Sequence, residues 1–181
     1  MAVTGHSVLQ LPVPDLEEWV RARTAHYDAG FVSSDPAFGH AHITALGPFA
    51  PAPSATMLRT VAALAADTAP IRVRLAGLGQ FPNGIIHLVP DPDHRLRDLT
   101  ARLVAAFPEH PPYGGEFGDD VQPHLTVDAA SDSVSLATTA VLMRDVVPVD
   151  VVLDRLQLAW WESGCCHVMG EWPLGPQGDF G

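Results

Sequence analysis

Lysine is missing from this 181-residue sequence, and all ten of its basic residues are arginine, against 21 acidic residues. The formal net charge is −11 at pH 7. Long nucleic acids bind through neutralisation of their phosphates by basic side chains, so a chain this acidic is not expected to bind them. A ligand that carries phosphate would instead be a small molecule, or a chain end held in a local pocket.

Long apolar runs are absent as well, because no segment approaches the roughly 18–20 unbroken apolar residues of a membrane span. Residues 1–7 show no basic segment followed by an apolar one, which disfavours a secretory signal. No membrane partner is expected, and the cytoplasm is the expected location. The only cysteines, Cys165 and Cys166, are adjacent and lack metal-ligand spacing, so we interpret them as small strand residues.

The composition, with 47% hydrophobic and 17% charged residues, is that of a compact globular chain. Its length suits one domain spanning 1–181, and a monomer is expected. Hydrophobic periodicity and capping signals predict helices at 15–25, 54–67, 93–107 and from 133 or 135 to 144. Alternating patterns and turn signals predict strands at 7–13, 40–46, 71–81, 85–89, 122–127, 149–160 and 166–172.

The order of these elements repeats along the chain. A strand that contains histidine, a helix and a pair of strands occur at 40–90 and again at 122–172. Residue identity between the two stretches is poor, so the repeat is one of pattern only. It predicts two pseudo-equivalent lobes joined by the helix at 93–107, and each lobe is too small to stand alone.

Two short segments in this repeat share one pattern, namely His-Ile-Thr at 42–44 and His-Leu-Thr at 124–126. Each lies in a predicted strand, where residues i and i+2 point to the same face. Each would therefore direct one imidazole and one hydroxyl to the same side. Two such units facing each other supply a general base, a general acid and two hydroxyl donors, which suits in-line chemistry at a phosphodiester without a metal.

These motifs resemble those of the two-histidine (2H) phosphoesterase superfamily, and in particular its 2′-5′ RNA ligase and cyclic phosphodiesterase branch. The signature of that family is a pair of His-x-Thr/Ser motifs, in which x is apolar, separated by several tens of residues. Here the first copy lies in HAHITALGPF at 40–49, and the second lies in QPHLTV within 122–128. The order of predicted elements extends the resemblance over nearly the whole chain.

The resemblance implies an α+β fold, a bilobal and pseudo-twofold domain in which two antiparallel sheets line a central cleft and helices lie outside. It also implies that His42, Thr44, His124 and Thr126 meet in the cleft as catalytic residues. The implied activity is metal-independent hydrolysis of a cyclic phosphate, of the 2′,3′-cyclic nucleotide or RNA-end type, or of a 2′-5′ phosphodiester. The implied partner is a small nucleotide or an RNA end, and no cofactor is expected.

In such a hydrolysis, one imidazole activates water and the other protonates the leaving ribose oxygen. The threonine hydroxyls can donate hydrogen bonds to the phosphate oxygens, where negative charge accumulates in the transition state. The sequence does not decide which histidine is the base. Our working assignment takes His124 as the base and His42 as the acid.

Other residues are weaker candidates for substrate binding. His40 would share the face of the first motif if that strand were regular, and Gln122 holds the matching place in the second motif. Tyr113 lies in the loop before the second motif, where it could shape one wall of the cleft. Aromatic side chains can stack on a base, although core packing is their commoner role; those considered are Phe49, Tyr113, Trp160 and Trp161.

Two other functions remain open from the sequence. A binding protein could keep the cleft and hold a nucleotide or phosphorylated metabolite without turnover, and a chelator-resistant activity would distinguish the enzyme from it. A metal-dependent hydrolase could use His40 and His42, with Asp128 as a further ligand, because histidines at i and i+2 of a strand can chelate zinc. Metal analysis of the purified protein would test that hypothesis.

Overall fold

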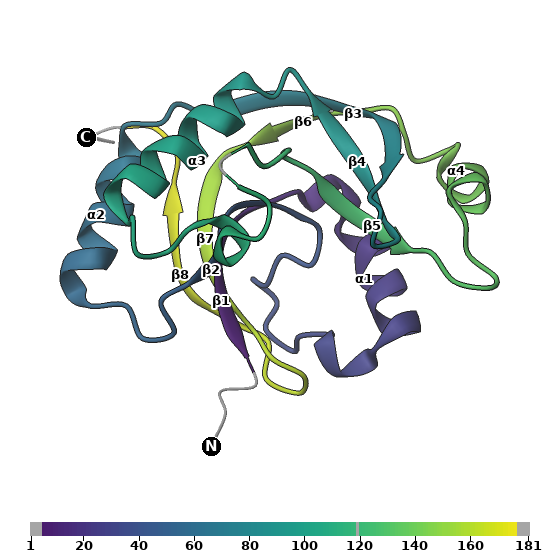
Figure 1. The fold of residues 1–181 in the computed structure, drawn as a ribbon, viewed down its shortest axis with the longest axis horizontal. Helices are drawn as coiled ribbons and strands as arrows, with labels where there is room; N and C mark the ends of the chain where they lie inside the picture. The colour runs from purple at the N-terminus through teal and green to yellow at the C-terminus, as the bar shows by residue number, and fades with distance from the viewer. Residues whose placement is uncertain (1–4, 119, 177–181) are drawn as a thin grey trace.

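The computed structural model describes residues 5–118 and 120–176, and in this part of the chain the strands form two four-stranded antiparallel sheets (Figure 1). The first sheet has the order β2 (His42–Phe49), β1 (His6–Pro12), β7 (Arg155–Trp161) and β8 (His167–Pro173). The second has the order β5 (Leu125–Ala129), β4 (Ile85–Asp91), β3 (Ile71–Gln80) and β6 (Val149–Leu153).

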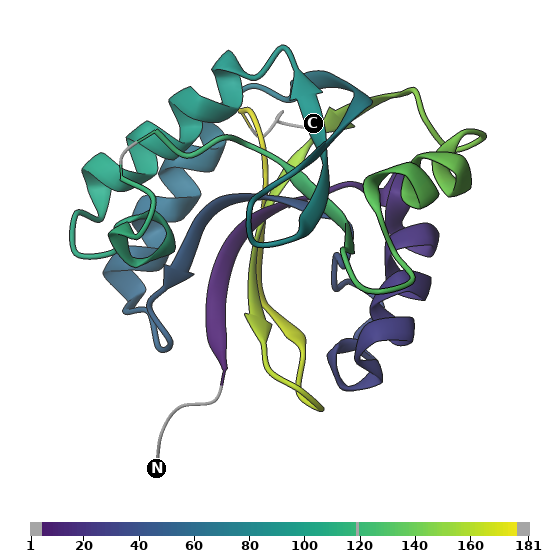
Figure 2. The ribbon, with the colours of Figure 1, turned by 45° about the vertical axis from the view of Figure 1, so that its right-hand side comes forward.

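The helices lie outside the sheets in two pairs, at opposite ends of the molecule in both views (Figures 1 and 2). The pair α2 (Ala55–Ala66) and α3 (His94–Ala106) contacts the first sheet, and the pair α1 (Glu17–Tyr27) and α4 (Leu136–Met143) contacts the second. The predicted α+β class with two antiparallel sheets is therefore confirmed. Within the described residues, no helix combines the length and the apolar character needed to cross a bilayer.

The chain passes between the two sheets more often than the sequence pattern suggests. The strands that follow the first motif, β3 and β4, belong to the second sheet beside β5, whereas β7 and β8 join the first sheet beside β1. The single strand expected at 149–160 is wrong, because Asp154 separates β6, which pairs with β3, from β7, which pairs with β1. Helix α3 does not join two lobes but packs on β2 of the first sheet.

Local sequence explains where the elements begin. The Ser54 hydroxyl accepts a hydrogen bond from the Met57 amide at the start of α2. Ser135, rather than Ser133, caps α4, where it forms a reciprocal pair of hydrogen bonds with Thr138. The start expected for the first helix at Asp15 falls instead in a short 3-10 turn, η1 (Pro14–Leu16), and two further 3-10 turns are η2 (Ala29–Phe31) and η3 (Pro112–Gly115).

An ion pair connects α1 to the second sheet. The guanidinium of Arg23 contacts both carboxylate oxygens of Asp128, at 2.9 and 3.1 Å, and the Thr139 hydroxyl donates to the same carboxylate at 2.9 Å. The Asp128 side chain is 0% exposed. A buried carboxylate is tolerated only while its partners remain, so this contact fixes α1 and α4 against β5.

We expect Arg23→Met to lower the free energy of unfolding by about 3 kcal/mol, because it leaves the buried Asp128 carboxylate without its counter-charge. Urea denaturation at neutral pH measures the effect. Arg74→Met is the matched control, since the Arg74–Asp150 pair is exposed (50% and 74%) and exposed pairs contribute at most about 1 kcal/mol. Equal losses in the two variants would contradict this account.

Candidate active site

The first motif holds its imidazole by a hydrogen bond to the backbone. His42 is the first residue of β2, and its Nδ1 lies 2.9 Å from the carbonyl oxygen of His40. A carbonyl oxygen only accepts, so Nδ1 carries the proton, and the Nε2 of the neutral ring is left with a free lone pair. The main chain thus sets both the orientation and the tautomer of His42.

The second motif repeats the same arrangement. The Nδ1 of His124 lies 2.9 Å from the carbonyl oxygen of Gln122, again two residues earlier in the chain. The ladder of β5 begins at Leu125, one residue after His124, rather than at Gln122 as expected. Gln122 therefore contributes its main-chain oxygen to the site, and its side chain belongs to an exposed residue.

Burial changes the acidity of both rings. Desolvation lowers the pKa of His42 from 6.5 to about 4, against the opposing effect of the His40 carbonyl, and the charge of His124 lowers it further. Burial also lowers the pKa of His124, while the Gln122 carbonyl opposes the shift. The two imidazoles interact electrostatically, and at pH 7 the neutral form of His42 predominates.

A cavity of about 530 Å³ opens beside the first motif. It is walled by aromatic rings and by polar groups of the first motif, and it contains one acidic side chain and none of the arginines; the lining residues are His6, Val8, Phe31, His42, Thr44, Gly47, Pro48, Tyr113, Gly114, Glu116 and Trp161. His124 and Thr126 are not among them. Uncharged groups and imidazoles, rather than guanidinium groups, are therefore available to an anionic ligand.

The second motif approaches the cavity through Tyr113. The rings of Tyr113 and His124 are nearly parallel, at 20°, with their centroids 6.4 Å apart. Thr126 lies in β5 opposite His87 of β4, and it is an exposed residue. Tyr113 thus lies between the cavity, which His42 and Thr44 also line, and the ring of His124.

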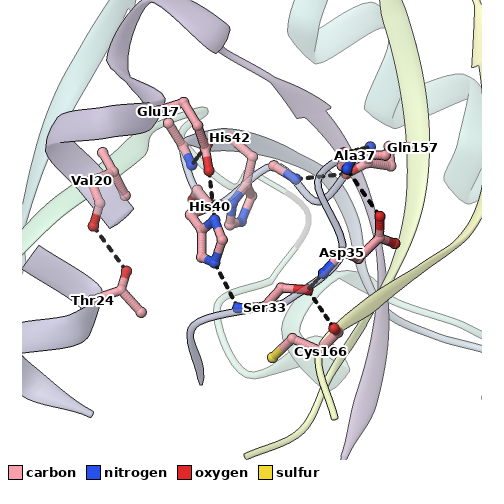
Figure 3. Close-up of polar contacts among 12 residues, drawn as sticks. Glu17, Val20, Thr24, Ser33, Asp35, Ala37, His40, His42, Gln157 and Cys166 are labelled. Carbon is pink, nitrogen blue, oxygen red and sulfur yellow. Dashed lines mark hydrogen bonds and ion pairs between the residues drawn. The ribbon is translucent and has the colours of Figure 1, made fainter. Parts of the chain in front are cut away.

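His40 has a different place from the one expected. It precedes β2, and its buried ring uses both nitrogens: Nδ1 bonds to the Glu17 carboxylate, and Nε2 accepts from the Ser33 amide at 3.0 Å (Figure 3). The second Glu17 oxygen accepts from the Ala41 amide at 2.9 Å. Burial alone would raise the pKa of Glu17, but the hydrogen bonds from His40 and Ala41 prevail and lower it. The pair fixes the main chain that holds His42.

The two aromatic candidates Phe49 and Trp160 lie away from the cavity lining. Phe49 is 4% exposed and packs against Phe107 and His110. The Trp160 indole donates to Glu162 at 2.8 Å and approaches the backbone of Gly5. The alternation of side chains along β7 places its neighbour, Trp161, on the cavity side instead.

Trp161 is fixed beside the first motif. Its ring centroid lies 5.1 Å from that of His42, and its Nε1 donates to the side-chain oxygen of Gln10 at 3.0 Å. The Gln10 amide in turn donates to Gln157 at 3.0 Å and to the Gly39 carbonyl at 2.8 Å. This buried chain of hydrogen bonds orients the indole as one wall of the cavity.

The sequence pattern that defines the 2′-5′ RNA ligase superfamily matches residues 11–164. This chain belongs to that superfamily. No curated protein matches the sequence.

Solved structures show the same 2H phosphoesterase fold at low sequence identity. E. coli LigT, in a crystal structure with 3′-AMP, is 16% identical with a TM-score of 0.55, over 96% of this chain and 99% of that one. A protein described as a phosphoesterase is 17% identical, also with a TM-score of 0.55, over 94% and 98%. The protein TT0787 of Thermus thermophilus is 20% identical with a TM-score of 0.53, over 96% and 100%.

For this member of the superfamily, the side chains of the alternative metal site do not come together. Both nitrogens of His40 are engaged, and the Asp128 carboxylate is bound by Arg23 and Thr139. Within residues 5–118 and 120–176, no group of three or more His, Cys, Asp or Glu side chains is arranged to hold a metal ion.

Two residues beside the site, Glu17 and His87, are not evident from the sequence. In the sequence, Glu17 is an acidic residue of the kind that is common in the first turn of a helix. Only the tertiary fold brings it to His40. His87 is buried, stacks on Phe81 at 3.9 Å between ring centroids, and lies 5.4 Å from the ring of His124. Burial lowers the pKa of His87, so a neutral ring faces the second motif. The alternation of side chains along β4 does not indicate this contact between His87 and His124.

We expect the ring of His42 to titrate at about pH 4 in the ligand-free protein, because its burial disfavours the charged form. A two-dimensional NMR titration of the histidine Cε1 signals measures this, and His42→Ala assigns the signal by its disappearance. A midpoint for His42 near the ordinary value of 6.5 would show that the ring is solvated, contrary to the structure.

Proposed function

We propose that this protein is a metal-independent phosphodiesterase that hydrolyses a cyclic phosphate, of the 2′,3′-cyclic nucleotide or RNA-end type, or a 2′-5′ phosphodiester. The observation that carries the proposal is the matched pair of imidazoles. Each Nδ1 donates to the carbonyl two residues earlier, which leaves each Nε2 for chemistry. Such a hydrolysis needs one group that accepts a proton and another that donates one, and two imidazoles near one cavity can fill these roles.

The proposed catalytic residues are His42, Thr44, His124 and Thr126. One imidazole removes a proton from water as the water attacks phosphorus, and the other protonates the departing ribose oxygen. The threonine hydroxyls donate to the non-bridging phosphate oxygens as negative charge accumulates there. The balance needs no external reagent, because the proton taken from water is replaced by the proton given to the leaving group.

The environment of the two rings favours the reverse of our sequence-based assignment. His42 is the more strongly buried ring, and its lowered pKa keeps it neutral at pH 7. The second motif is the more open of the two, since the His124 hydrogen bond is exposed and that of His42 is partly buried. Desolvation disfavours the charged form of a ring less where the ring is more open, so His124 is the easier of the two to protonate. We therefore propose His42 as the base and His124 as the acid.

The cavity favours a small substrate with one phosphodiester charge. Its lining holds Glu116 and no arginine, and the whole chain carries a net charge of −11. Crystal structures of E. coli LigT contain 3′-AMP, NADP+ and ATP. Small nucleotides are therefore the class that we propose for this chain, and among them those with a single phosphodiester charge rather than several phosphates, with the protein acting as a monomer in the cytoplasm.

The direct test is hydrolysis of the four nucleoside 2′,3′-cyclic monophosphates in EDTA by the wild type, His42→Ala and His124→Ala. We expect turnover that resists the chelator and falls at least about 100-fold in each variant, because each loses one proton-transfer group. His94→Ala, which removes an exposed histidine at the start of α3, is the control and should keep wild-type activity.

The same variants assign the two roles when they are assayed with a nucleotide 4-nitrophenyl ester. Its leaving group departs without protonation. The variant that lacks the acid should therefore keep most of its turnover, whereas the variant that lacks the base should lose as much turnover as it does with the cyclic nucleotides. Turnover that EDTA abolishes would overturn the metal-independent mechanism. Nucleotide binding without turnover of any of these substrates would instead support the binding-protein alternative.

A further inference from the structure

Tyr113 has a backbone conformation that few side chains adopt. It lies in the turn η3, between α3 and β5, with φ of 51° and ψ of 35°. Within residues 5–118 and 120–176, it is the one non-glycine residue with a positive φ. Strained backbone of this kind destabilises the fold and tends to be kept where it positions a functional group. The glycines that follow, Gly114 and Gly115, continue the left-handed turn at little cost.

The turn carries the Tyr113 side chain to both motifs. Its hydroxyl interacts with the Thr44 hydroxyl of the first motif, and its ring lies nearly parallel to His124 of the second. It lines the cavity together with His42. Among the described side chains, the phenol of Tyr113 is therefore placed where a phosphate held between the two motifs would lie.

The phenol remains a hydrogen-bond donor across the working pH range. Burial raises the pKa of Tyr113, and the hydrogen bond with Thr44 opposes that shift only in part. A neutral hydroxyl next to an anionic ligand keeps its proton and directs it to the anion. The cavity needs such donors, because none of the ten arginines lines it and the neutral form of His42 predominates at pH 7.

We propose that Tyr113 is a third hydrogen-bond donor to the non-bridging oxygens of the reacting phosphate, beside Thr44 and Thr126. This inference rests on the proposed function and adds a catalytic residue to it. The hydroxyl exchanges its partner Thr44 for a phosphate oxygen as the substrate enters, and Thr44 becomes free to donate as well. The left-handed turn places the phenol before the substrate arrives, so no rearrangement of the loop is required.

The kinetic test compares Tyr113→Phe with the wild type on the cyclic nucleotide that is turned over fastest. Loss of one preorganised donor should lower kcat by about 10- to 100-fold, with a smaller change in KM, because the bond strengthens as charge develops. The matched control is Tyr27→Phe, since Tyr27 and Tyr113 are the only tyrosines and Tyr27 is 43% exposed. The control should keep wild-type kcat. An unchanged kcat in Tyr113→Phe would overturn the proposal.

A binding measurement covers the case in which Tyr113→Phe does not fold, because it leaves Tyr113 in place. In Tyr27→Phe protein labelled with 13Cζ-tyrosine, Tyr113 gives the single tyrosine signal. We expect this signal to move saturably at neutral pH when inorganic phosphate is added, in parallel with the ring signals of His42. A Tyr113 signal that stays fixed while the His42 signals move would overturn the proposal.

The two measurements also separate this inference from the function on which it rests. Turnover of a cyclic nucleotide with an unaffected Tyr113→Phe variant would leave the phosphodiesterase intact and remove Tyr113 from its mechanism. A phosphate-dependent shift of the Tyr113 signal, in a protein that hydrolyses none of the cyclic nucleotides, would support the placement of Tyr113 and overturn the proposed activity.

Discussion

The site depends above all on one hydrogen bond that occurs twice, from each Nδ1–H to the carbonyl oxygen two residues earlier. This bond fixes the tautomer of His42 and His124 through the main chain, so the lone pair of each neutral ring lies on Nε2. The main chain must then be held still. The Glu17–His40 pair does this for the first motif, and the Arg23–Asp128 pair anchors the strand of the second.

The electrostatics of the cavity follow from its lack of arginine side chains. For the anionic substrate that we propose, the cavity offers neutral donors and imidazoles, because none of the arginines lines it. We therefore propose ligands with one negative charge, because further phosphates would meet Glu116 without a balancing cation. Burial, which holds the pKa of His42 at about 4, keeps that ring available as a base.

Much of the fold and the centre of the site could be predicted from the sequence, because both depend on local patterns. Alternation, capping residues and the two His-x-Thr motifs are local, and they predicted most of the strands and helices and the candidate residues His42 and His124. The choice between Trp160 and Trp161 depends on strand register, and the contact of Glu17 with His40 depends on tertiary packing. No local sequence pattern indicates the register of β7 or the contact of Glu17 with His40. The sequence does not indicate that 149–160 divides into two strands. Its apolar pattern is continuous, and such a pattern also fits a chain that passes from one sheet to the other.

We propose that His42 and His124 act together on one phosphate. A nucleoside vanadate, whose five-coordinate vanadium mimics the transition state, tests this most directly when histidine side-chain 15N NMR is recorded during its titration. We expect the Nε2 signals of both residues to move with one saturation curve, and both Nδ1 atoms to stay protonated. A complex that moves the signal of only one of the two histidines would contradict it.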